Sequence, residues 1–185
     1  MGINILGLGS YVPEQKLTND DFTRFVETND EWIRTRTGIR ERRMAGWEPT
    51  WYMGLQAAKQ AVEKSGINPE DIGLVIDCSV TPDFLTPSMS SVIQGRIGAV
   101  NAAAFDLNAA CSGFVYALDT AERFLRTDDN LKYVLVVANE ALSRFVDFND
   151  RTTCILFGDG AAAAVLERSD KLFSSHIASD GSGAG

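Results

Sequence analysis

The 185-residue sequence contains a single histidine and only three cysteines, and both shortages exclude common kinds of site. His176 has no second histidine with which to form a zinc-binding pair, and the cysteines lie far apart with no CxxC motif. This spacing predicts no metal site. The absence of closely spaced cysteine pairs also favours a reducing compartment.

Basic residues and long apolar runs are also scarce. Seventeen Lys and Arg residues against 25 Asp and Glu residues give a formal net charge of −8. Because a non-specific nucleic-acid surface needs a basic face, this balance argues against nucleic-acid binding. No apolar run approaches membrane-spanning length, and the first residues lack the charged start and apolar region of a signal peptide. We therefore expect a cytoplasmic protein without a membrane partner.

The residues that are present predict a globular α/β protein. The sequence is 45% hydrophobic and 23% charged, which is enough apolar content for a sizeable core. Apolar runs typical of buried strands alternate with stretches of helical spacing. The expected strands are 3–8, 74–78, 104–107, 133–138 and 161–166, and the expected helices are 18–26, 53–64, 88–97 and one starting near 111. This alternation predicts right-handed βαβ crossovers and a mainly parallel sheet covered by helices.

Cys111 is the most informative residue, because it follows the expected strand 104–107 and begins an amphipathic helix. The first-turn amides and the helix dipole favour a thiolate there. The small residues 109–110 and 112–113 leave room for a substrate carbonyl and let the Cys111 amide face a developing oxyanion. The alternative is a packing cysteine. Since active sites of open parallel sheets lie beyond the carboxyl ends of strands, the position favours a nucleophile.

Three other features have simpler interpretations. Cys78 and Cys154 lie in apolar, strand-like stretches and are expected to be inert core residues. Gly158-Asp159-Gly160 fits neither a P-loop nor a dinucleotide fingerprint, and it predicts a tight turn before a strand. Residues 145–151 are expected to form a loop near the mouth of the site.

Three segments, in order, carry a resemblance to a known family. They read NDEWIRTRTGIRER at 29–42, NAACSGFVYAL at 108–118 and FGDGA at 157–161. Together they resemble β-ketoacyl-[acyl-carrier-protein] synthase III, a condensing enzyme of the thiolase superfamily. The resemblance covers essentially all of the chain and implies a thiolase-like fold. It assigns residues 1–170 to the N-terminal half and residues 171–185 to the start of the connection to an absent C-terminal half.

The resemblance also implies an activity, the initiation of fatty-acid synthesis. Cys111 would accept an acyl group from acyl-CoA as a thioester, and the full enzyme would condense it with malonyl-acyl carrier protein, with loss of CO2, to 3-ketoacyl-acyl carrier protein. No cofactor is implied, since acyl-CoA is a substrate. The family's catalytic histidine and asparagine belong to the C-terminal half, so we expect this chain alone to be inactive and the full enzyme to be a homodimer.

The same resemblance names substrate-binding residues. It places Trp32 and Arg151 on the two faces of the CoA adenine, with polar contacts from Thr28 and Arg36 near the nucleotide. Indole and guanidinium planes suit adenine stacking. The alternative is that the arginines of residues 34–43 form a solvated basic stretch, and such a patch would also suit an acidic carrier protein.

Thr86 matches a family position that reaches the acyl pocket of the partner subunit. Some members carry phenylalanine there, and the smaller threonine predicts tolerance of acyl primers longer or more branched than acetyl. The alternative is an ordinary turn residue before Pro87.

Two other function classes stay open, and the residues do not name the preferred primer or the pathway. One is an acyltransferase of secondary metabolism that uses Cys111 without condensation. The other is a non-catalytic partner subunit that keeps the fold for assembly. The intact surroundings of Cys111 and the presence of Trp32, Arg36 and Arg151 argue against the second class.

Overall fold

A five-stranded sheet runs through the centre of the computed structural model, which describes residues 2–183. Its strands, in spatial order, are β1 (Gly2–Tyr11), β7 (Asp159–Ser169), β6 (Tyr133–Ala141), β4 (Ile72–Cys78) and β5 (Ala103–Leu107). β4 pairs in parallel with β5 and β6, whereas β7 pairs antiparallel with β1 and β6. Four strands therefore share one direction and only β7 opposes them, so the α/β class and the mainly parallel sheet are confirmed.

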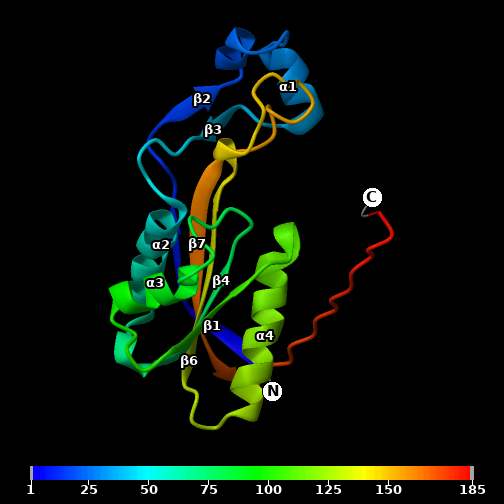
Figure 1. The fold of residues 1–185 in the computed structure, drawn as a ribbon. Coiled ribbons are helices and arrows are strands. Elements are labelled where there is room, and N and C mark those ends of the chain that lie inside the picture. Colours follow the sequence, from blue (N-terminus) through cyan, green and yellow to red (C-terminus); the bar gives the residue numbers. More distant parts are fainter. Residues whose placement is uncertain (1, 184–185) are drawn as a thin grey trace.

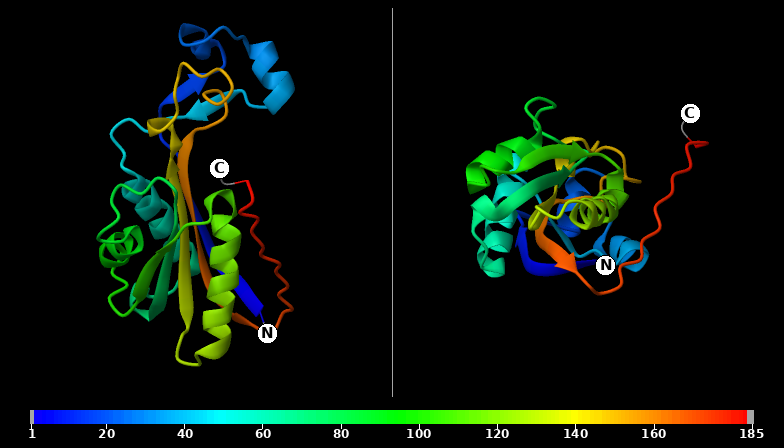
Figure 2. Two further views of the ribbon diagram at one scale, coloured as in Figure 1. Left: turned by 45° about the vertical axis from the view of Figure 1, so that its right-hand side comes forward. Right: turned by 90° about the horizontal axis from the view of Figure 1, so that it is seen from below.

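Helices cover both faces of this sheet (Figures 1 and 2). α2 (Thr50–Ser65) and α3 (Met89–Ile97) lie on one face, and α4 (Gly113–Thr127) lies on the other. Each face has its own core of small and branched apolar side chains, with Ala57, Ala61 and Val75 on the first and Ala117, Ala121 and Leu125 on the second. The alanines let the helices approach the sheet closely, which fixes the position of α4 and its N-terminal end.

A small lobe lies beyond the carboxyl ends of the parallel strands (Figure 1). It contains β2 (Lys16–Thr18), a 3-10 helix (Asp20–Arg24), α1 (Asp30–Thr37), β3 (Glu41–Arg43) and the segment 145–157. The buried side chains of Phe22, Ile33, Cys154 and Ile155 form its core. The lobe stands at the same end of the sheet as the start of α4, so both border one region of the molecule.

Most of the expected elements are confirmed, with two corrections. The strands and the three long helices occur where the apolar periodicity places them. The helix expected at 18–26 is only the 3-10 helix Asp20–Arg24, with Thr18 Oγ1 accepting a hydrogen bond from the Asp21 amide at 3.4 Å. The expectation of a strand around Cys154 is wrong, because residues 151–156 form turns and Cys154 is buried by the lobe core instead. None of the helices in residues 2–183 has both the length and the apolarity to cross a membrane.

Asp77 on β4 is fully buried at the centre of the sheet. Asn139 on β6 donates from Nδ2 to Asp77 Oδ1 at 2.7 Å, while Asp77 Oδ2 and Asn139 Oδ1 are buried without hydrogen-bond partners. Burial, followed by the nearby carboxylates of Asp106, Glu140 and Asp83, holds the pKa of Asp77 well above its usual value. Both unpartnered atoms are acceptors, and the raised pKa favours the protonated form of Asp77, which carries the one donor that this pair lacks.

Asp77→Asn is therefore expected to stabilise the protein increasingly as the pH rises. The folded-state pKa of Asp77 is raised above its unfolded-state value. The contribution of Asp77 to stability is therefore fully present below the unfolded-state pKa, and it is lost as the pH rises through the folded-state pKa. Asparagine keeps a donor for Asn139 and does not titrate. We expect a gain of about 1–3 kcal/mol at pH 8.5 and a smaller one at pH 5.5. Urea unfolding at both pH values measures this, with the exposed Asp170→Asn as control; an equal gain at both pH values would contradict it.

Candidate active site

Cys111 is presented at the start of α4 by a strained turn. β5 ends at Leu107, and Asn108 Oδ1 then accepts a hydrogen bond from the Ala110 amide at 3.4 Å. Ala110 has a φ of 46°, in the left-handed region that non-glycine residues rarely adopt. Gly113 allows the first turn of α4 to approach β4, since a Cβ there would lie 3.2 Å from Cys78 Cβ. The turn leaves Cys111 exposed, at the carboxyl end of the parallel strands as predicted.

A cavity of about 470 Å³ opens beside Cys111. Its walls come from the ends of β4, β6 and β7 and from the first turn of α4, and most of the lining side chains are apolar. The lining includes the side chains of Val80, Phe114, Leu142 and Phe157. This apolar space adjoins the thiol directly, so it suits a hydrophobic group attached to the sulfur.

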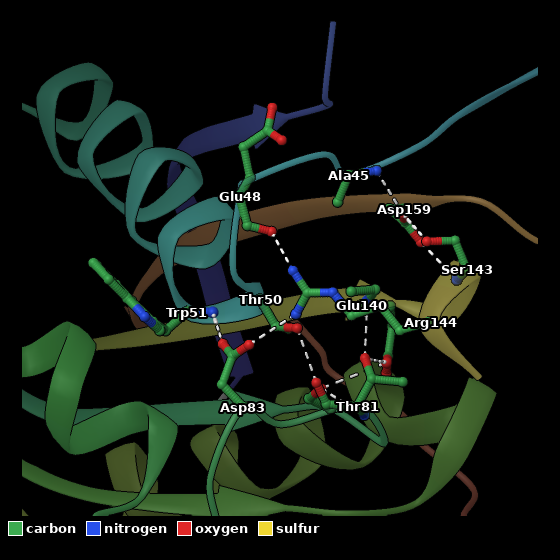
Figure 3. Close-up of polar contacts among 12 residues, drawn as sticks. Ala45, Glu48, Thr50, Trp51, Thr81, Asp83, Glu140, Ser143, Arg144 and Asp159 are labelled. Atoms are coloured by element: carbon green, nitrogen blue, oxygen red, sulfur yellow. Dashed lines mark hydrogen bonds and ion pairs between the residues drawn. The ribbon is translucent and has the colours of Figure 1, made fainter. Parts of the chain in front are cut away.

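Polar contacts hold the walls of this cavity in place (Figure 3). Glu140, at the end of β6, accepts hydrogen bonds from the Val80 amide at 2.8 Å and from Thr81 Oγ1. Arg144 forms an ion pair with Asp83 at 3.0 Å and donates to the carbonyl of Glu48 at 2.7 Å. These bonds tie the loop after β4 to the end of β6 and to the entry of α2. This network could not be predicted from the sequence, because its members are scattered polar residues without a motif.

Cys78 and Cys154 differ sharply from Cys111. Cys78 is buried, its Sγ lies 3.0 Å from the carbonyl oxygen of Val137, and burial raises the pKa of its thiol to about 12. Burial also raises the pKa of the Cys154 thiol. The expectation that both are inert core residues agrees with their burial, and Cys111 is the one exposed cysteine of residues 2–183.

The structure brings together three of the four residues expected to bind CoA. The Arg151 guanidinium carbon lies 3.9 Å from the centroid of the Trp32 ring, and that of Arg36 lies 4.5 Å from it. Trp32 and Arg151 are therefore in direct contact, and a planar ring between them would have to separate them. Thr28 Oγ1 is buried and has no hydrogen-bond partner. We call Trp32 and Arg151 the base clamp, after the role that the resemblance predicts for them.

Thr86 and His176 lie outside the Cys111 cavity. Thr86 is exposed in the loop between β4 and α3, and its side chain does not line the cavity. His176 is exposed in the extended segment after β7, which reaches α4 through hydrogen bonds such as Ser175 Oγ to Asp119 and Tyr116 Oη to the Ala178 carbonyl. β7 ends at Ser169, and the boundary expected at residue 170 stays a prediction. Residues 2–183 contain no cluster of three or more potential metal-ligating side chains.

Comparison with known proteins supports the resemblance. The family model for 3-oxoacyl-[acyl-carrier-protein] synthase III matches residues 105–181. The β-ketoacyl-[acyl-carrier-protein] synthase III of Clostridium acetobutylicum is 49% identical over 183 residues, which are 98% of this chain and 56% of that protein. The chain thus spans about half the length of the curated relatives it matches.

Two solved structures are similar in fold as well as in sequence. The 3-oxoacyl-[acyl-carrier-protein] synthase III of Aquifex aeolicus superposes with a TM-score of 0.88 at 48% identity, covering 92% of this chain and 55% of that one. The priming β-ketosynthase of the R1128 polyketide biosynthetic pathway also gives 0.88, at 41% identity, covering 92% of this chain and 51% of that one. By sequence and fold, the chain is similar to β-ketoacyl-[acyl-carrier-protein] synthase III, as its three motif segments predict.

Proposed function

We propose that this chain is the acyl-accepting half of an enzyme that starts fatty-acid synthesis by joining an acyl group from acyl-CoA to malonyl-acyl carrier protein. The observation that carries the proposal is the exposed Cys111 thiol beside an apolar cavity of about 470 Å³. The similarity to this family supports the reaction class, and the contact between Trp32 and Arg151 supports a nucleotide site in the lobe.

The first step transfers the acyl group to Cys111. The thiolate attacks the thioester carbonyl of acyl-CoA, a new S–C bond forms, and CoA leaves as a thiol with the proton that Cys111 gave up. The acyl chain then lies among apolar side chains such as Phe114, Leu142 and Phe157. In the second step malonyl-acyl carrier protein loses CO2, the resulting carbanion attacks the thioester carbonyl, and the Cys111 thiolate leaves.

The second step needs groups that this half does not supply. The family resemblance assigns the histidine and asparagine that stabilise the carbanion and oxyanion to a C-terminal half. Large apolar side chains on β1 and α4 are exposed here, including Leu8 at 55%, Val115 at 50% and Phe124 at 44%. Such surfaces are unusual on a protein that functions alone, so they support a partner half that covers them. We propose that the complete enzyme is a homodimer of such two-part subunits.

Intact-protein mass spectrometry tests this function directly. A protein containing this chain and the second half, incubated with acetyl-CoA or a branched acyl-CoA, is expected to gain one acyl mass at Cys111. Addition of malonyl-acyl carrier protein should then remove the adduct and yield the 3-ketoacyl product. Residues 1–185 alone should give no condensation product. Condensation by the isolated chain would contradict the need for a second half, and failure to acylate Cys111 in the complete protein would contradict the enzyme itself.

A polyketide-priming role is the second candidate, favoured by the 41% identity to the priming β-ketosynthase of the R1128 pathway. It shares the acylation step and differs in the primer and carrier used. Because acyl groups of both kinds are expected to label Cys111 in either role, the carrier protein whose malonyl thioester is condensed separates the two roles. We expect Thr86 to permit the longer primers, and Thr86→Phe to reduce their labelling while acetyl labelling continues.

A further inference from the structure

A buried arginine without an acidic partner lies at the centre of the small lobe. Arg42, on β3, is 4% exposed, and its guanidinium carbon lies 4.5 Å from the centroid of the Phe22 ring. Within residues 2–183 no carboxylate pairs with it, and burial lowers the pKa of its guanidinium. Burial of an unpaired charge is unfavourable, so a packing role alone would be served better by an apolar side chain.

The guanidinium instead donates hydrogen bonds in two directions. Nε donates to the carbonyl oxygen of Ile155 at 2.8 Å, and Nη2 donates to the same oxygen. On the other side, Nη1 donates to Asn19 Oδ1 at 2.5 Å. A planar fork can reach two partners at fixed angles in this way, whereas a lysine ammonium on its flexible stem cannot reproduce both.

These two partners connect to the two sides of the base clamp. Ile155 belongs to the turns of residues 151–156, which begin with Arg151. Asn19 is 2% exposed, and its Nδ2 donates to Asp30 Oδ1 at 2.8 Å and to the Ile39 carbonyl at 2.7 Å. Asp30 is the first residue of α1 and Ile39 follows its end, so Asn19 holds both ends of the helix that carries Trp32.

We propose that Arg42 is a positioning residue that holds Arg151 and Trp32 in the register in which they receive the planar base of a CoA nucleotide. This inference rests on the CoA-dependent function proposed above. Arg42 is buried beneath the clamp and need not touch the substrate. Its effect is transmitted through Ile155 to the Arg151 turn and through Asn19 to α1. A nucleotide-free acyl thioester makes no use of the clamp and is therefore indifferent to Arg42.

Arg42→Lys in the complete protein tests the proposal with two acyl donors. With acetyl-CoA we expect the KM to rise about tenfold with kcat nearly unchanged. A tenfold rise corresponds to the loss of one charge-assisted hydrogen bond. With acetyl-N-acetylcysteamine, which lacks the nucleotide, kcat/KM should stay at the wild-type value. Arg168→Lys is the matched control, because Arg168 also donates to backbone carbonyls, those of Leu125 and Asp128, and both donors should be unaffected.

A double-mutant cycle separates positioning from general destabilisation. In a Trp32→Ala background, Arg42→Lys should raise the KM for acetyl-CoA by less than it does in the wild type, because one of the two side chains through which it acts is gone. Asn19→Ser, which interrupts only the connection to α1, should act in the same direction and serves if Arg42→Lys does not fold. Equal losses with both donors, or an undiminished effect in the Trp32→Ala background, would overturn the proposal. A wild-type protein that accepts acetyl groups from the nucleotide-free donor alone would instead overturn the CoA-dependent function on which it rests.

Discussion

Cys111→Ala is expected to abolish acyl transfer, lowering the rate of acyl-enzyme formation by at least about a thousandfold. No neighbouring group can replace the lost nucleophile, because Cys78, the other cysteine lining the cavity, is buried with its thiol pKa raised to about 12. The measurement is the mass of the complete protein after incubation with acyl-CoA. Cys154→Ala is the matched control and should acylate at the wild-type rate, since Cys154 lies in the lobe core.

The difference in exposure between Cys111 and the other two cysteines can also be measured on the isolated chain. In the native protein iodoacetamide should label Cys111 alone, because it is exposed while Cys78 and Cys154 are buried. Labelling of all three cysteines should appear only after unfolding. An acyl adduct that persists in Cys111→Ala, or a native label that maps to Cys78, would refute the assignment of Cys111 as the nucleophile.

The junction of β5 and α4 could be predicted from the sequence because every local signal there agrees. The apolar strand, the small residues around Cys111 and the helical spacing from Phe114 onward all favour one arrangement. The strained Ala110 could not be predicted, because alanine gives no sign of a positive φ. Nor could the close approach of Gly113 to Cys78, which joins residues far apart in the sequence.

The lobe was harder to predict, for two different reasons. The ends of α1 can be predicted, since Asn29 accepts a hydrogen bond from the Trp32 amide and Gly38 ends the helix with a φ of 75°. Its eight residues, however, carry little apolar periodicity. The contact between Trp32 and Arg151 spans residues far apart in sequence and followed only from the family resemblance. The apolar run around Cys154 predicts a strand that does not form, because such a run alone cannot distinguish a strand from a buried turn. The antiparallel direction of β7 likewise cannot be predicted from its local sequence.

Gly9→Ala is expected to destabilise the protein by about 3 kcal/mol or more, at the upper end for an overpacked core. β1 meets α2 backbone to backbone: a Cβ at Gly9 would lie 1.9 Å from the Ala57 carbonyl oxygen and 2.7 Å from the Ala61 nitrogen. The methyl group would meet helix backbone and not a flexible side chain. Relief would require β1 to move away from α2, yet β1 is also held in its register with β7. Thermal unfolding should show the loss as a midpoint lower by roughly 10 °C. Urea unfolding should show it as a midpoint at a lower urea concentration.

Gly95→Ala is the control that shows whether the effect of Gly9→Ala comes from close packing. Gly95 lies in α3, is exposed, and has no atom within 4 Å of the position that a Cβ would take. The same added methyl group should therefore stabilise the protein by up to about 1 kcal/mol, through the better helix propensity of alanine. The two glycine substitutions are thus expected to have opposite signs. If Gly9→Ala unfolded at the wild-type midpoint, β1 and α2 could not be packed this closely, and the edge of the sheet at β1 would need a different arrangement.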